Sequence, residues 1–133
     1  MTTFIEIVAR ARMDAIAKAL GVDPLPDWEG YSELDRSVSL EIASCIVNGN
    51  RIMTPSMAHD IFRAMCPADH EQNVPIEDQP LDLQYLEFVG LHAAIVAAIV
   101  NADGPEQGSM FVIMRMALCT TVPEEWVPVP TPA

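Results

Sequence analysis

The sequence has almost no lysine, no glycine cluster and none of the short catalytic motifs that identify common enzyme classes. Lys18 is the single lysine, and helical spacing puts it on the same polar face as Glu6 and Asp14. The six glycines lie apart from one another, so no glycine-rich loop can cradle a phosphate. The patterns HExxH, GxSxG and CxxC are absent. We therefore expect a protein that is not an enzyme, with no catalytic residue and no cofactor.

Basic residues are scarce in general. The chain carries 19 acidic against seven basic residues, a formal net charge of −12, and residues 67–133 contain only one base, Arg115. Such a surface repels phosphate backbones and anionic lipid headgroups, so we expect no direct nucleic-acid partner and no membrane binding. It suits a basic protein partner. An acidic surface that serves only solubility is the alternative.

Cysteines and long apolar runs are limited too. Three widely spaced cysteines, Cys45, Cys66 and Cys119, indicate buried free thiols in a reducing cytoplasm. The N-terminal stretch MTTFIEIVARAR has Glu6 inside its apolar run and no basic leader, which does not indicate a signal peptide. The longest apolar run, residues 88–100, is shorter than the roughly 20 residues that cross a bilayer. These features predict a cytoplasmic protein.

The most prominent feature that is present is this apolar run, which predicts a central helix over about residues 81–101. Within 88–100, FVGLHAAIVAAIV, only His92 is polar, so the helix belongs in a core and His92 should be hydrogen-bonded there. Gly90, Ala94 and Ala98 recur every four residues and form a ridge that lets another helix come close. This ridge is either a packing face inside the chain or the seam of a homodimer.

Apolar spacing and helix boundary signals predict four further helices. They lie at 3–20, 32–48, 54–65 and about 106–119. The first has Leu20 on its apolar face and ends at Gly21, the second opens with Ser32 and Asp35 three residues later, and the third opens with Thr54 before a proline. The expected fold is all-α, a single-domain bundle of about five helices over residues 1–122.

Two segments lie outside these helices. Residues 67–80, PADHEQNVPIEDQP, hold three prolines, four acids and little that could be buried, which predicts an acidic loop of a length that is often functional. Its acids are Asp69, Glu71, Glu77 and Asp78. Residues 123–133 hold four prolines, which predicts an extended tail with Trp126 as its anchor. We expect the four acids and Trp126 to contact a partner. A merely solvated loop is the alternative.

Histidine and cysteine supply the remaining candidates for chemistry. Cys45, His59, Cys66 and His70 come nearest to a metal cluster, but they lack the tight spacing of structural zinc ligands, so we predict no metal site. His59 and Asp60 are neighbours on a helix and point about 100° apart. They cannot form a base with its orienting carboxylate without help from elsewhere in the chain.

One stretch is similar to a known group of proteins. Residues 25–28, LPDW, followed by Leu34, Arg36 and Ala43, resemble the opening of small phage-encoded helical accessory proteins, in which a P-x-W turn leads into a helix. The likeness covers about 25 of the 133 residues and departs from that pattern at Tyr31 and Leu34. It implies a phage or mobile-element origin and assigns no functional residue.

These observations predict a non-enzymatic protein–protein interaction protein. In the terms of the resemblance, it is a phage or mobile-element factor that binds a basic host protein in the host cytoplasm and inhibits or redirects it. The alternative is a structural or assembly component of a phage particle. In that case the tail at 123–133 docks on a neighbouring subunit and the chain forms a homo-oligomer.

Overall fold

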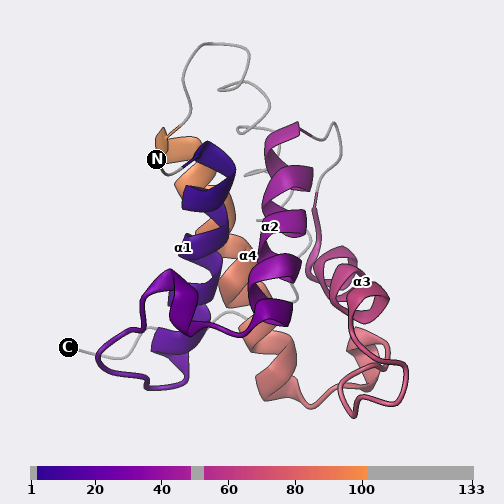
Figure 1. The fold of residues 1–133 in the computed structure, drawn as a ribbon. Helices are drawn as coiled ribbons and strands as arrows, with labels where there is room; N and C mark the ends of the chain where they lie inside the picture. The colour runs from indigo at the N-terminus through magenta and orange to yellow at the C-terminus, as the bar shows by residue number, and fades with distance from the viewer. Residues whose placement is uncertain (1–2, 49–52, 102–133) are drawn as a thin grey trace, which may run out of the picture.

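The computed structural model describes residues 3–48 and 53–101, and these residues form an all-α fold, as predicted. The α-helices in this part of the chain are α1 (Phe4–Ala19), α2 (Glu33–Asn48), α3 (Pro55–Met65) and α4 (Leu81–Asn101) (Figure 1). Two short 3₁₀ turns, η1 (Trp28–Gly30) and η2 (Ile76–Asp78), lie in the connections. The described part therefore has four helices. The fifth predicted helix at 106–119, the boundary at 122 and the tail with Trp126 lie outside the described residues.

The helices begin where local side chains satisfy the free N–H groups of their first turns. Thr3 Oγ1 accepts a hydrogen bond from the backbone N–H of Glu6, and Thr54 Oγ1 accepts one from Met57. Ser32 Oγ accepts from the backbone N–H of Asp35 at 3.0 Å. These bonds remove unpaired donors that water would otherwise have to satisfy. The predicted starts of the first three helices are therefore confirmed, since the expected residue caps each one.

Helices α1 and α4 make the most extensive helix pair of the described fold. Gly90 of α4 lies against α1, because a Cβ placed there would be 2.8 Å from Ile16 Cδ1 and 3.0 Å from Arg12 Cγ. Ala94 and Ala98 continue the same ridge and are fully buried. The absence of long side chains along this ridge is what allows the two helices to approach. The chain itself thus covers the small-residue ridge.

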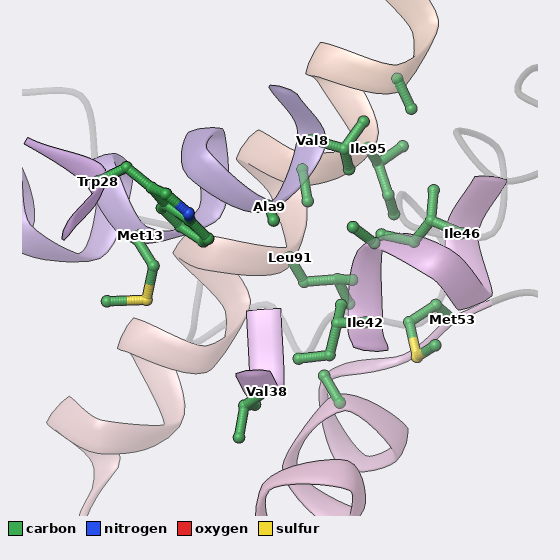
Figure 2. Close-up of a cluster of buried hydrophobic side chains, with 14 residues drawn as sticks. Val8, Ala9, Met13, Trp28, Val38, Ile42, Ile46, Met53, Leu91 and Ile95 are labelled. Carbon is green, nitrogen blue, oxygen red and sulfur yellow. The ribbon is translucent and has the colours of Figure 1, made fainter. Parts of the chain in front are cut away.

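A single aliphatic core joins α1, α2 and α4 (Figure 2). Figure 2 shows Leu91 of α4 near the centre of this cluster, with side chains of α1 and α2 around it. Val8, Ile42, Ile46, Leu91 and Ile95 are its largest fully buried apolar side chains together with Val38. Burial of each such side chain contributes about 1.5–3 kcal/mol relative to exposure. The core therefore fixes how the three helices pack, and α3 is added at its edge.

Two expectations about burial are wrong. His92 is exposed rather than hydrogen-bonded in the core, and Val100 of the same helix is 74% exposed. Leu20, expected on the apolar face of the first helix, is 63% exposed because it caps the C-terminal end of α1. By length and composition α4 would also pass as a membrane span, as the core helix of a soluble protein does. Because α4 is apolar on every side, its sequence did not indicate which side the other helices would cover.

Candidate functional site: a buried ionic network beneath the acidic loop

A charged side chain from α1 points into the interior. Arg12 lies on the same helix face as Val8, Ala9 and Met13, and only 6% of it is exposed. A buried guanidinium is stable only when other groups replace its water. Its Nη1 donates to Ser39 Oγ of α2 at 2.8 Å, and its Nη2 contacts a carboxylate of α4. Arg12 thereby connects three helices by polar contacts inside an apolar core.

The carboxylate that receives Arg12 is Glu87. Its Oε1 lies 2.9 Å from Arg12 Nη2 and its Oε2 lies 3.3 Å from His59 Nδ1, while 12% of the side chain is exposed. Burial by itself raises the pKa of Glu87, but the hydrogen bonds and charges of His59 and Arg12 outweigh it and hold the pKa below its ordinary value. Glu87 is therefore ionised and shared by two cationic partners. We call Arg12, Glu87 and His59 the ionic network.

His59 continues the network from α3 to the loop. Its Nδ1 faces Glu87, and its Nε2 lies 2.8 Å from the backbone carbonyl of Val74. Both ring nitrogens thus lie near acceptors, and the doubly protonated imidazolium can donate to both; Gln79 Nε2 also lies 3.4 Å from His59 Nε2. The hydrogen bond to Glu87 raises the pKa of His59, burial opposes this, and the Val74 carbonyl raises it further. The loop is consequently tied to a buried charge.

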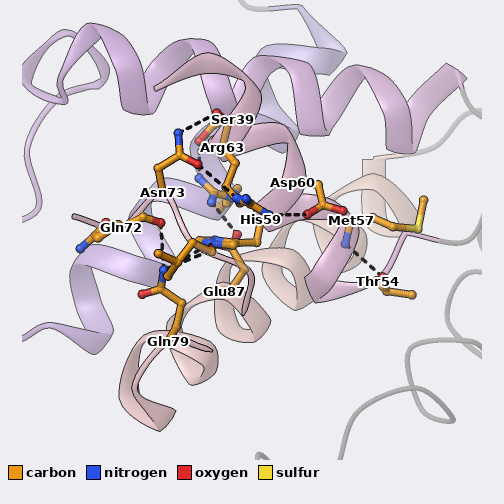
Figure 3. Close-up of polar contacts among 12 residues, drawn as sticks. Ser39, Thr54, Met57, His59, Asp60, Arg63, Gln72, Asn73, Gln79 and Glu87 are labelled. Carbon is orange, nitrogen blue, oxygen red and sulfur yellow. Dashed lines mark hydrogen bonds and ion pairs between the residues drawn. The ribbon is translucent and has the colours of Figure 1, made fainter. Parts of the chain in front are cut away.

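Amide side chains hold the remainder of the loop, and Figure 3 shows Gln72, Gln79 and Glu87 gathered around His59. Gln79 is 8% exposed and its Nε2 donates to the carbonyl of Gln72 at 2.9 Å. Asn73 Nδ2 donates to the carbonyl of Arg63 at 3.2 Å, and its Oδ1 accepts from Arg63 Nε at 3.1 Å. Ordering a residue's backbone costs about 1–2 kcal/mol, and such anchored contacts offset that cost. The loop therefore has a defined conformation.

The prediction that the loop has little to bury is wrong. Ile76 is 7% exposed, and η2 is formed around it. By contrast, all four acids predicted to contact a partner are exposed, and none lies within ion-pair distance of a cation of the described chain. They are Asp69, Glu71, Glu77 and Asp78, called the loop carboxylates below. The segment is thus anchored from its inner side and negatively charged on its outer side.

A cavity of about 180 Å³ lies between this loop and the four helices. Its lining includes all three members of the ionic network, together with apolar side chains from α1, α3 and α4. Asp35 of α2 and the loop residues Gln72 and Gln79 complete its polar lining. Convergence of polar groups in a largely apolar cavity is typical of a ligand-binding site.

The other residues singled out from the sequence are not assembled for chemistry. Asp60 is directed to Arg63, at 4.0 Å, and the carboxylate that orients His59 is Glu87. Over residues 3–48 and 53–101, no three His, Cys, Asp or Glu side chains are grouped to hold a metal ion. Both oxygens of Glu87 and both ring nitrogens of His59 are engaged by the protein itself. The ionic network in this state therefore offers no free base.

Sequence reasoning missed Arg12 and Glu87. A signal existed, because Arg12 interrupts the apolar face that continues through Val8 and Met13. Glu87 likewise precedes Leu91 and Ile95 at intervals of four residues, on the buried side of α4. A positive charge on the apolar face of one helix and a negative charge on that of another predict that the two side chains form an ion pair where the faces pack together. The side chains are 75 residues apart, so their pairing was not evident from local spacing.

Comparisons of the chain with protein-family models, with curated proteins and with solved structures found no match. The similarity of the turn at 25–28 to phage accessory proteins therefore stays a prediction.

Proposed function

We propose that the protein is a non-enzymatic binding protein that docks a basic protein partner through the acidic loop at 67–80. The observation that carries this proposal is the anchoring of the loop. Its backbone carbonyls at Gln72 and Val74 are held by the buried side chains of Gln79 and His59. The loop carboxylates are exposed on that anchored backbone. A charged surface of fixed shape can select a partner, and a solvated flexible loop would not need buried anchors.

The energetic benefit of this arrangement is preorganisation. Ordering a flexible interface costs about 0.5–1.5 kcal/mol for each immobilised side chain, and a loop already ordered in the free protein avoids part of that cost. The net charge of −12 adds long-range attraction for a basic surface. Such attraction mainly accelerates association and weakens with added salt. We therefore infer a partner with a positively charged docking surface.

The proposed biological setting follows from the resemblance described above. A phage or mobile-element factor of this kind would bind a host protein and inhibit or redirect it. The assembly alternative depends on residues 123–133, which lie outside the described part of the chain, and no described residue favours it over the first proposal.

Matched charge variants test the docking surface. The loop variant is Asp69→Asn, Glu71→Gln, Glu77→Gln and Asp78→Asn. The control variant is Asp23→Asn, Asp27→Asn, Glu29→Gln and Glu41→Gln, which removes the same charge from other exposed positions. Each is used as bait in host lysate at physiological salt, and retained proteins are identified by mass spectrometry.

The expected result is a basic protein that the wild-type and control baits retain and the loop bait loses. Retention of the same proteins by all three baits would show that net charge, and not this surface, determines capture. Failure of the wild-type bait to retain any basic protein would contradict the proposal as a whole.

A further inference from the structure

The cavity under the acidic loop is lined by one carboxylate that no described residue engages. Its cationic lining residues already have an anionic partner: Arg12 pairs with Glu87 and donates to Ser39, and His59 pairs with Glu87 and contacts the Val74 carbonyl, while Arg12 Nε is buried without a hydrogen-bond partner. Asp35 also lines the cavity, but its carboxylate makes no hydrogen bond or ion pair with any residue of the described chain. Among the charged lining residues, Asp35 is therefore the one without an ionic partner in the described chain, and its carboxylate is complementary to a cationic donor.

Asp35 is placed there by helix geometry. It lies one turn before Ser39 on α2, so it shares the inward face from which Ser39 reaches Arg12. The Ser32 cap uses the backbone N–H of Asp35 at 3.0 Å and leaves the carboxylate out of the capping interaction. The side chain is half-buried, so it keeps access to solvent. This carboxylate can receive a ligand without breaking a hydrogen bond or ion pair to residues 3–48 or 53–101.

The electrostatic surroundings also favour a cation. With His59 protonated, the two positive groups of the lining balance Glu87 and Asp35. Glu71 adjoins Gln72, and Glu77 and Asp78 lie between the lining residues Ile76 and Gln79. The charges inside the cavity therefore sum to zero. The electrostatic potential around its opening is then set by the nearby loop carboxylates and is negative. A positively charged group is attracted toward this region of the surface.

The size and the walls specify the shape of the ligand. A cavity of about 150 Å³ is enough to take up benzene, so about 180 Å³ holds a group of five or six non-hydrogen atoms. Met13, Phe62 and Leu83 supply apolar wall. A lysine side chain has four methylenes that can lie on such a wall and a compact ammonium that can reach a carboxylate.

We propose that this cavity receives one lysine side chain of the basic partner, with its ammonium paired to Asp35. The inference rests on the proposed function, because it makes the cavity the specific pocket beneath the acidic docking surface. The loop carboxylates attract the partner, and the cavity selects an aliphatic cation. Single anchoring side chains in pockets commonly dominate binding at protein interfaces.

The test uses a defined probe that does not depend on the partner. Nα-acetyl-lysine amide is titrated into the full chain while backbone amide signals are followed by NMR. The matched neutral probe is Nα-acetyl-norleucine amide, which has the aliphatic stem without the charge. The variants are Asp35→Asn and, as a control, Asp82→Asn, an exposed acid on the first turn of α4 that does not line the cavity.

We expect saturable shifts at Asp35, Gln72 and Ile76 with the lysine probe, and about fivefold weaker binding of the norleucine probe, the effect of a partly exposed ion pair. Asp35→Asn should weaken lysine-probe binding by the same factor, and Asp82→Asn should leave it unchanged. No saturable shift at the lining residues, or equal binding to the Asp35→Asn protein, would overturn the inference.

The two proposals fail separately. Loss of partner retention in the loop variant concerns the docking surface and is measured without the probe. Saturable probe binding without any retained partner would support the cavity and contradict the proposed function. Retention that depends on the loop, together with absent probe binding, would support docking and overturn the lysine pocket.

Discussion

Glu87→Leu should be among the most destabilising single substitutions in this chain. It leaves the guanidinium of Arg12, a side chain that is 7% exposed, without its carboxylate partner at 2.9 Å. Removing one member of a buried ion pair costs roughly 3–5 kcal/mol, because the other charge stays buried and uncompensated. Arg12→Leu should cost less, roughly 1–3 kcal/mol, because Glu87 keeps His59 as a partner.

The double variant tests this reasoning most directly, because it should be more stable than Glu87→Leu although it carries one substitution more. Arg12→Leu combined with Glu87→Leu contains neither buried charge of the pair, and His59 can become neutral. Replacement of a buried ion pair by apolar side chains is often neutral or stabilising. We therefore expect the double variant to lie within about 2 kcal/mol of the wild type and to be more stable than Glu87→Leu alone.

Urea unfolding followed by circular dichroism measures these free energies by linear extrapolation. The four proteins are compared at one pH near 6, where His59 is charged in the folded state. If Glu87→Leu costs less than about 1 kcal/mol, or if the two single costs simply add in the double variant, the buried pair is not held as described. Should Glu87→Leu fail to fold, recovery of folding in the double variant gives the same answer.

Three further outcomes are expected. Gly90→Ala should lower the free energy of unfolding by about 1 kcal/mol, because the new Cβ would lie 3.0 Å from both Arg12 Cγ and Ile16 Cγ1 and Arg12 is held by its ion pair, so overpacking exceeds the gain in helix propensity. A melting curve unchanged by Gly90→Ala would contradict the close approach. Folding raises the pKa of His59 above 6.5, so its contribution to stability is complete below that pH and is lost as pH rises through the folded pKa. Stability measured from about pH 6 to 9 should therefore fall, and the fall should be smaller in His59→Gln; parallel curves would refute the coupling. Thr54→Ala should cost about 1 kcal/mol through loss of the 3.2 Å cap, whereas Ser56→Ala, exposed on the same helix, should change the unfolding free energy by less than about half that amount in chemical denaturation.

The helices of the described chain could be predicted because their determinants are local. Thr3, Ser32 and Thr54 each satisfy N–H groups within three residues, so a start signal in the sequence is also the physical cause of the start. The bounds of α4, Leu81–Asn101, match the helix predicted over about 81–101 around the apolar run at 88–100. Secondary structure here follows from interactions that span a single helical turn.

The candidate site could be predicted only in part. The loop carboxylates were identified from composition, and their exposure follows from their charge. The loop's anchors were not identified, because His59 reaches Val74 and Gln79 reaches Gln72 only after the chain has turned back on α3. The cavity at Asp35 was not predicted, since it is formed by residues from four helices and the loop together.

The sequence by itself determined that the described chain is helical, where its helices begin and that its surface is acidic, because capping, apolar spacing and net charge are local or additive properties. Only the tertiary structure decided that Arg12 and Glu87 meet across 75 residues and that His59 locks the loop. It also decided which side of the apolar α4 is covered. Those outcomes depend on which helix faces come together, and a charge or an apolar stripe has several possible partners until the core is packed.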